Sequence, residues 1–81
     1  MSDTLVNLMN SGNQWAAERA QYALQIQNAL QEGQMSPSEA KELLQDLLNT
    51  QVLAEDAADA QFKAALVFGI TTAIELASSA I

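Results

Sequence analysis

The C-terminal half of the chain constrains the fold most, because it lacks the residues that normally end a helix. Between Ser38 and Ile81 there is no proline and a single glycine, Gly69. Apolar residues recur at helical spacing along this stretch, which predicts a helix over about residues 37–66 that continues or kinks into a helix over residues 66–81. A two-helix hairpin with such an arm leaves apolar surface uncovered. We therefore expect copies of the chain or a larger assembly to complete the core.

Capping residues predict two helices before this one. A short helix covers about residues 3–10. Ser11 and Asn13 are alternative N-caps for a second helix over about residues 13–32. Gly33 follows that helix and favours its end, because glycine adopts the left-handed backbone conformation that often terminates helices.

The start of the third helix has the clearest signal in the chain. Ser36 is a favourable N-cap, Pro37 suits the first helical position, and Glu39 can reach back to the cap amide. Because the connection from Gly33 is short, we expect an antiparallel hairpin. The sequence thus predicts an all-α fold: one helical domain over residues 1–81, in which a short N-terminal helix and a long C-terminal arm flank the hairpin.

Two polar residues interrupt apolar helix faces and meet in the expected hairpin register. Arg19 lies opposite Gln51, and Glu55 follows one turn farther on. Three interpretations are open for the guanidinium: it reaches water along Trp15 and Tyr22, it joins an internal polar layer with Gln51 and Glu55, or it contacts a partner. An internal layer would fix the register of the hairpin, as buried polar residues do in coiled coils.

Several apolar residues point away from the hairpin and are candidates for a protein interface. Val52 and Leu53 either join the core through a break near Asn49 or form a second contact surface on a continuous helix. The absence of a helix breaker favours the contact surface. Phe68 lies in a polar arc beside Thr71, so we expect it to anchor a partner. The expected interface residues are Val52, Leu53, Leu66, Phe68, Ile70, Ile74 and Ile81.

The apolar C-terminal segment also raises the question of a membrane. Ala64–Ile81 contains 18 residues and one charged residue, Glu75, whereas a spanning helix needs about 20 apolar residues. Its polar residues gather on one side of the helix, which a lipid-spanning helix does not require. A carboxylate at mid-span costs about 2.5 to 3.5 kcal/mol, and no cationic flank is present to offset it. We therefore expect this segment to dock on protein rather than on lipid.

The residue types absent from the chain argue against catalysis. Without cysteine or histidine the chain has no disulfides, no usual zinc ligands and no usual general base. Carboxylates share helix faces, as in Glu39, Glu42 and Asp46, but such faces are far more often solvated than bound to a metal. We expect a protein that is not an enzyme and needs no cofactor or metal.

The charge balance argues against direct binding to nucleic-acid phosphates. The formal net charge is −7, and the three cations, Arg19, Lys41 and Lys63, are too few and too dispersed for that role. The N-terminal residues lack the cationic start and long apolar run of a signal peptide. We therefore expect the protein to be cytoplasmic when it is made.

In its short length, its lack of cysteine and histidine, and its glutamine- and alanine-rich surface, the chain resembles small helical accessory proteins of tailed-phage particles. The resemblance implies a structural or assembly protein that associates with itself or packs into a larger assembly, such as a virion. One alternative is a small acidic regulator that occupies a basic site on a partner with Glu39, Glu42, Asp46, Glu55, Asp56 and Asp59. Another is a membrane-associated helix or pore former that uses residues 64–81.

Overall fold

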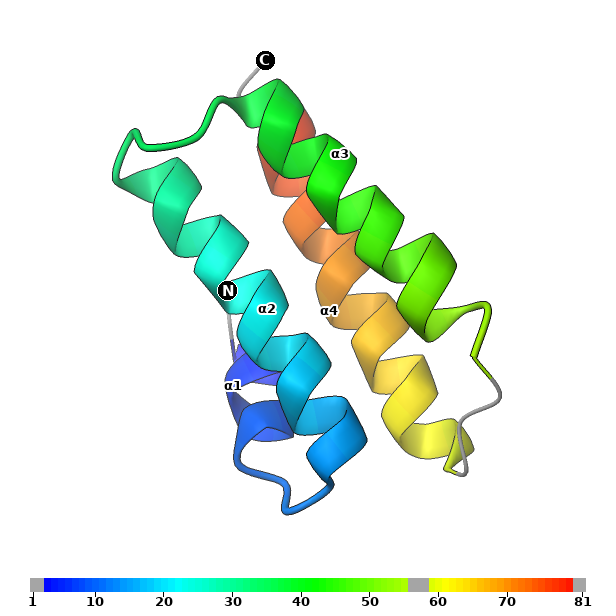
Figure 1. The fold of residues 1–81 in the computed structure, drawn as a ribbon. Coiled ribbons are helices and arrows are strands. Elements are labelled where there is room, and N and C mark those ends of the chain that lie inside the picture. Colours follow the sequence, from blue (N-terminus) through cyan, green and yellow to red (C-terminus); the bar gives the residue numbers. More distant parts are fainter. Residues whose placement is uncertain (1–2, 56–58, 80–81) are drawn as a thin grey trace.

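The computed structural model describes residues 3–55 and 59–79, and its regular elements are all helical (Figure 1). The elements are, in chain order, α1 (Asp3–Met9), α2 (Gln14–Gln31), α3 (Pro37–Leu47), the π-helical turn η1 (Leu48–Val52) and α4 (Ala60–Ser79). The predicted all-α class, with a short N-terminal helix and a long C-terminal helix, is confirmed.

The helices begin where their capping residues predict. Asn13, rather than Ser11, caps α2, because its side chain accepts a hydrogen bond from the backbone N–H of Ala16 at 3.0 Å. At the start of α3, Ser36 Oγ accepts from the backbone N–H of Glu39 at 3.2 Å. Glu39 Oε1 in turn accepts from the backbone N–H of Ser36 at 3.4 Å. This complete capping box fixes the start of α3.

Two glycines with positive φ make the turns on either side of α2. Gly12 has φ 83° and Gly33 has φ 74°, a region that side chains other than glycine rarely enter. The second turn folds α3 back along α2 as an antiparallel hairpin, in agreement with the sequence prediction (Figure 1). Leu30 of α2 and Ala40 of α3 line the same cavity, as the expected register requires.

The helix that begins at Pro37 ends much earlier than the sequence pattern predicts. Regular α-helix stops at Leu47, and η1 closes with a hydrogen bond from the Leu53 N–H to the Leu48 carbonyl at 2.8 Å. The chain then reverses, and α4 runs back antiparallel to α3 (Figure 1). The expectation of one helix over residues 37–66 was therefore wrong.

The π-helical turn explains which residue of this region enters the core. A π turn holds one more residue than an α turn, so it shifts the helix face by one position. A regular helix would place Gln51 in line with the buried Leu44 and Leu47. In the structure Val52 is fully buried instead, while Gln51 is half-buried. The break thus replaces a polar core position with an apolar one.

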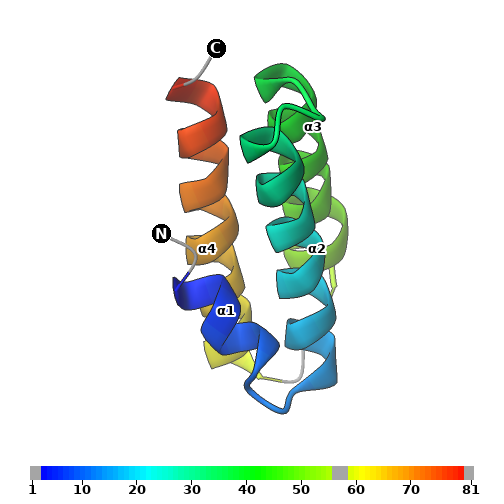
Figure 2. The ribbon, with the colours of Figure 1, turned by 90° about the vertical axis from the view of Figure 1, so that its left-hand side faces the viewer.

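The remaining helices close the bundle (Figure 2). α2, α3 and α4 pack side by side, and α1 lies across the lower half of the groove between α2 and α4. α1 has 7 residues and α2 has 18, so α1 can cover only part of that groove. This difference in length leaves the other end of the groove open.

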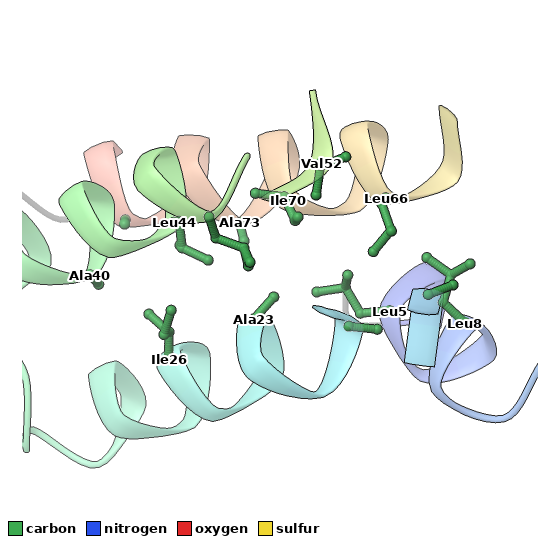
Figure 3. Close-up of a cluster of buried hydrophobic side chains, with 14 residues drawn as sticks. Leu5, Leu8, Ala23, Ile26, Ala40, Leu44, Val52, Leu66, Ile70 and Ala73 are labelled. Atoms are coloured by element: carbon green, nitrogen blue, oxygen red, sulfur yellow. The ribbon is translucent and has the colours of Figure 1, made fainter. Parts of the chain in front are cut away.

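A single hydrophobic core joins all four helices (Figure 3). Its buried residues are Leu5, Leu8, Ala16, Ala20, Ala23, Ile26, Ala40, Leu44, Leu47, Val52, Leu66, Ile70, Ala73 and Ala77. These side chains are enclosed within one chain, so they do not need a second copy to bury them, and association with copies or a larger assembly stays a prediction. The reversal before α4 and the docking of α1 cover this apolar surface within one chain.

α1 approaches α4 closely at Gly69. A Cβ atom placed on this residue would lie 2.8 Å from Leu5 Cδ2 and 3.1 Å from Leu5 Cγ. Carbon atoms in contact normally lie about 3.5 to 4.0 Å apart. The absence of a side chain at Gly69 therefore lets Leu5 enter the core. An unexpected glycine within a helix was the sequence signal that could have predicted this close contact.

Candidate functional site

The candidate site centres on an exposed aromatic side chain of α4. Phe68 is 65% exposed, the largest exposed fraction of any large hydrophobic residue in the described chain. It lies outside the core, as the sequence predicts. Its backbone carbonyl accepts a hydrogen bond from Thr72 Oγ1 at 2.9 Å, so the neighbouring hydroxyl is satisfied within the same helix.

The stretch of α4 around this aromatic carries no charge. No residue between Lys63 and Glu75 is ionisable, although the chain has ten acidic residues. Val67, Thr71 and Thr72 are half-buried on the same stretch of α4. A protein can therefore cover this surface without removing a charge from water, which is the costly step when charged residues are buried.

Three of the expected interface residues belong to the core instead. Val52, Leu66 and Ile70 are fully buried within the single chain. The prediction that they contact a partner was wrong for one shared reason. They were assigned to an arm that leaves the hairpin, whereas η1 and the return of α4 bring all three inward.

The other expected interface residues differ in their positions. Leu53 follows η1 and is 49% exposed, so it is available to a partner. Ile74 is half-buried and packs against the core. Ile81 lies outside the described residues. Of the predicted set, Phe68 and Leu53 are the described residues with a largely exposed apolar side chain.

A polar cluster links α2 to the chain after η1. Arg19 Nη2 donates to Glu55 Oε1 at 3.2 Å, and the Trp15 indole N–H donates to Glu55 Oε2 at 2.8 Å. Both carboxylate oxygens are thus engaged. These hydrogen bonds lower the pKa of Glu55 below its ordinary value, with the Trp15 bond as the larger cause and partial desolvation opposing it.

Arg19 combines two of the interpretations drawn from the sequence. Its guanidinium carbon lies 5.1 Å from the centre of the Trp15 ring, and its Nη1 donates to the Trp15 carbonyl at 3.2 Å. The side chain is 16% exposed, so it both runs along the aromatic ring and makes an internal ion pair with Glu55. The predicted contact between Arg19 and Glu55 is confirmed.

Gln51 takes no part in this cluster. Within the described residues its side chain has no hydrogen bond to Arg19 or Glu55. The predicted three-residue layer was wrong in this respect, because η1 turns Val52 rather than Gln51 toward the core. On a straight helix Gln51 would instead lie opposite Arg19.

Lys63 completes the connection, a role that sequence reasoning missed. Its Nζ donates to the Leu53 carbonyl at 3.4 Å and to the Glu55 carbonyl at 3.2 Å. These bonds hold the chain after η1 against the first turn of α4. Together with the Arg19 and Trp15 hydrogen bonds to Glu55, they stabilise the change of chain direction between η1 and α4, which the sequence pattern did not predict. The cluster therefore has a structural explanation and offers no arrangement for catalysis.

A small apolar cavity lies at the open end of the groove between α2 and α4. Its volume is about 180 Å³. Its lining comes from Gln27, Leu30 and Gln31 of α2, Ala40 and Leu44 of α3, and Ala73 and Leu76 of α4. α1 does not reach this end of the groove (Figure 2). The cavity has mostly aliphatic walls and is therefore suited to an apolar group.

The acidic residues of α3 line a second, more open groove. Glu39, Glu42 and Asp46 lie around Leu43 there, in a space of about 400 Å³. Among residues 3–55 and 59–79, however, no group of three or more histidine, cysteine or acidic residues is placed to hold a metal ion. Asp56, which the regulator hypothesis would use together with these residues, lies outside the described residues.

α4 is long and apolar enough to cross a membrane when judged by length and composition alone. Its mean hydropathy over an 18-residue window is 1.3, and 28% of that window is buried in the structure. A core helix of a soluble protein also passes this test. Leu66 and Ile70, two of its most apolar residues, already pack within the protein.

Comparisons of the chain with known protein families, with curated proteins and with solved structures found no match. The functional interpretation therefore depends on the surface chemistry of the chain itself.

Proposed function

We propose that this protein is a non-enzymatic structural or assembly protein that docks on other protein through the outer side of α4. The observation that carries the proposal is the 65% exposure of Phe68 on an otherwise uncharged stretch of helix. Large aromatic side chains commonly supply much of the binding energy at protein interfaces.

The closed core strengthens this argument. Among residues 3–55 and 59–79, fourteen hydrophobic residues are buried without any contribution from Phe68, so the fold does not require an aromatic residue at this position. Exposed aromatic surface is unfavourable in water, and covering an aromatic side chain removes a large apolar area from solvent. Docking on a partner therefore gives Phe68 a role that folding does not.

The narrower form of the proposal is a component of a virus particle. The small size, the absence of cysteine and histidine, and the glutamine- and alanine-rich composition support it through resemblance to tailed-phage accessory proteins. In this form the protein is made in the cytoplasm and incorporated during particle assembly.

A photo-crosslinking amino acid at position 68 tests the proposal. The variant is expressed in cells that naturally make the protein, and adducts are identified by mass spectrometry. Gln45, an exposed residue of α3, is the matched control position. We expect protein adducts from position 68 and few from position 45. Absence of protein adducts at position 68 would contradict the proposal.

Membrane association is a second candidate, favoured by the length and hydropathy of α4. It requires α4 to leave the core, since Leu66, Ile70 and Ala73 are buried between helices. The same crosslinking experiment distinguishes the two candidates, because lipid adducts at position 68 would support the membrane. Co-sedimentation of the protein with liposomes provides an independent measurement.

A further inference from the structure

Phe68 belongs to a row of side chains that leads to the cavity at the open end of the groove. Phe68, Thr72 and Leu76 are spaced four residues apart, so they form one ridge along α4. The first is exposed, the second is half-buried, and the third lines the cavity. The ridge therefore runs from an exposed aromatic side chain at one end to an unfilled apolar cavity at the other.

The cavity has the size of the aromatic ring. Its volume is about 180 Å³. An apolar cavity of about 150 Å³ in another protein holds benzene, whose ring matches the phenyl group of phenylalanine. The Leu30, Leu44 and Leu76 side chains give this cavity aliphatic walls. Phe68 cannot fill the cavity of its own chain, because its side chain is exposed on the outer side of α4 and the cavity residues Ala73 and Leu76 lie about 7.5 and 12 Å farther along the helix.

In a pair of copies, Phe68 of each chain can be buried in the cavity of the other. A two-fold axis through Thr72 makes the two α4 helices antiparallel and places Phe68 of each copy opposite Leu76 of the other. Ridges with four-residue spacing on two helices pack at a crossing angle of about −50°, the commonest class in globular proteins. The interface is then the same on both copies, as in most soluble dimers.

Two acidic copies repel each other overall, but the distribution of charge keeps this ridge free of acidic residues between positions 63 and 75. The chain carries a net charge of −7, yet the residues between Lys63 and Glu75 are uncharged. A basic partner would be attracted to the acidic faces elsewhere rather than to this ridge. In the two-fold arrangement the two Glu75 residues lie at least about 9 Å apart along the helix, close to the screening length at physiological salt.

We propose that two copies of this chain form an antiparallel dimer through α4, with Phe68 of each copy inserted into the cavity of the other. This inference rests on the proposed function, because it names the partner of the same surface. A typical stable interface covers about 800 Å² on each partner. That is comparable with the whole broad face of this molecule, which measures 35 by 23 Å. One helix crossing covers less, so we expect a dissociation constant in the micromolar range.

Sedimentation analysis over about 1 µM to 1 mM tests the association, a range that brackets the expected affinity. The intact chain should shift from monomer to dimer, and Phe68→Ala should weaken the dimer at least about tenfold. Tyr22→Ala is the matched control, because Tyr22 is an exposed aromatic residue on α2 rather than on the α4 ridge, and it should leave the dimer unchanged. A chain that stays monomeric at 1 mM, or a dimer that Phe68→Ala does not weaken, would overturn the inference.

Two further variants test the geometry. Thr72→Cys introduces the only thiol of the chain at the two-fold axis, so mild oxidation should give a disulfide-linked dimer, whereas Gln45→Cys on the exposed side of α3 should not. Ala73→Met fills the cavity within the monomer and should weaken the dimer at least about tenfold while the monomer stays folded by circular dichroism. If Ala73→Met unfolds the monomer, the Thr72→Cys result decides the geometry.

Failure of disulfide formation at position 72, or a folded Ala73→Met variant that dimerises normally, would overturn the arrangement. These outcomes separate the inference from the proposed function. A monomeric chain that still gives adducts to other proteins at position 68 contradicts the dimer and leaves the docking surface intact. The absence of any protein adduct contradicts both.

Discussion

The contact between Gly69 and Leu5 makes a prediction in which two physical effects oppose each other. Gly69→Ala adds a residue that favours helix, which alone stabilises the protein by about 1 kcal/mol. The added Cβ, however, would lie 2.8 Å from Leu5 Cδ2, and Leu5 is only 1% exposed. Overpacking of a filled core costs about 1 to 3 kcal/mol. We therefore expect Gly69→Ala to destabilise the protein by about 1 kcal/mol, within a range of about 0 to 2 kcal/mol.

A double-mutant cycle separates the two effects. Leu5→Ala should cost about 2 to 5 kcal/mol on its own, because it empties a buried position. In that background the new methyl group of Gly69→Ala meets no leucine, so the helix preference should dominate and the change should stabilise by up to about 1 kcal/mol. The sign of the Gly69→Ala effect should thus reverse between the two backgrounds, with a coupling energy of about 1 to 3 kcal/mol.

Urea unfolding followed by circular dichroism measures the four free energies of unfolding that the cycle requires. Ala64→Gly, at an exposed position inside α4, reports the difference in helix preference between alanine and glycine without the contact. Additivity of the two substitutions within about 0.5 kcal/mol would show that α1 does not dock on α4 through this pair. Stabilisation by Gly69→Ala in the otherwise unaltered chain would refute the argument for close packing.

Three further predictions test the core, η1 and the polar cluster. Leu44→Ala should lower the free energy of unfolding by about 2 to 5 kcal/mol in urea titrations, because Leu44 is fully buried. Val52→Ala should lower the free energy of unfolding by at least about 1 kcal/mol, and Gln51→Ala should lower it by less than about 0.5 kcal/mol. A larger loss for Gln51→Ala than for Val52→Ala would argue for a regular helix instead of η1. The pKa of Glu55 is lowered in the folded state, so its contribution to stability is present above the pKa of the unfolded chain and is lost as pH falls through the lowered value. Glu55→Gln should therefore weaken the dependence of stability on pH in the acidic range, as followed by Trp15 fluorescence, and an unchanged profile would exclude this carboxylate as a source.

The parts of the fold that the sequence predicted are those decided by neighbouring residues. The capping box at Ser36 and Glu39 works through hydrogen bonds between residues three apart, so its signal lies within four letters of sequence. The left-handed turns at Gly12 and Gly33 are equally local. These signals were sufficient for the all-α class and the α2–α3 hairpin, because a short turn leaves two adjacent helices few ways to pack.

The reversal after η1 could not be predicted in the same way, because no local breaker marks it. A continuous helix satisfies the local preferences of this stretch but leaves Leu66 and Ile70 in water. The reversed chain buries both residues, and the Lys63 and Glu55 contacts fasten the turn. Tertiary packing thus outweighs local preference here. The exposure of Phe68 could be predicted, because helical spacing alone places it on the polar side of α4, wherever that helix begins.

The short length of α1 connects the fold to the proposed interface. A helix of 7 residues is about 10 Å long and α2, with 18 residues, is about 27 Å long, so α1 covers less than half of the groove beside it. A longer α1 would fill the cavity near Ala73 and Leu76 and cover the upper part of the α4 ridge. Within the described residues the core closes without that extra turn of helix, so none of them fills the cavity, and Phe68 of a second copy supplies a ring of the size that the cavity accepts. Extending α1 by one turn should therefore stabilise the monomer and weaken the dimer, because the added turn and the second copy would compete for the same apolar surface.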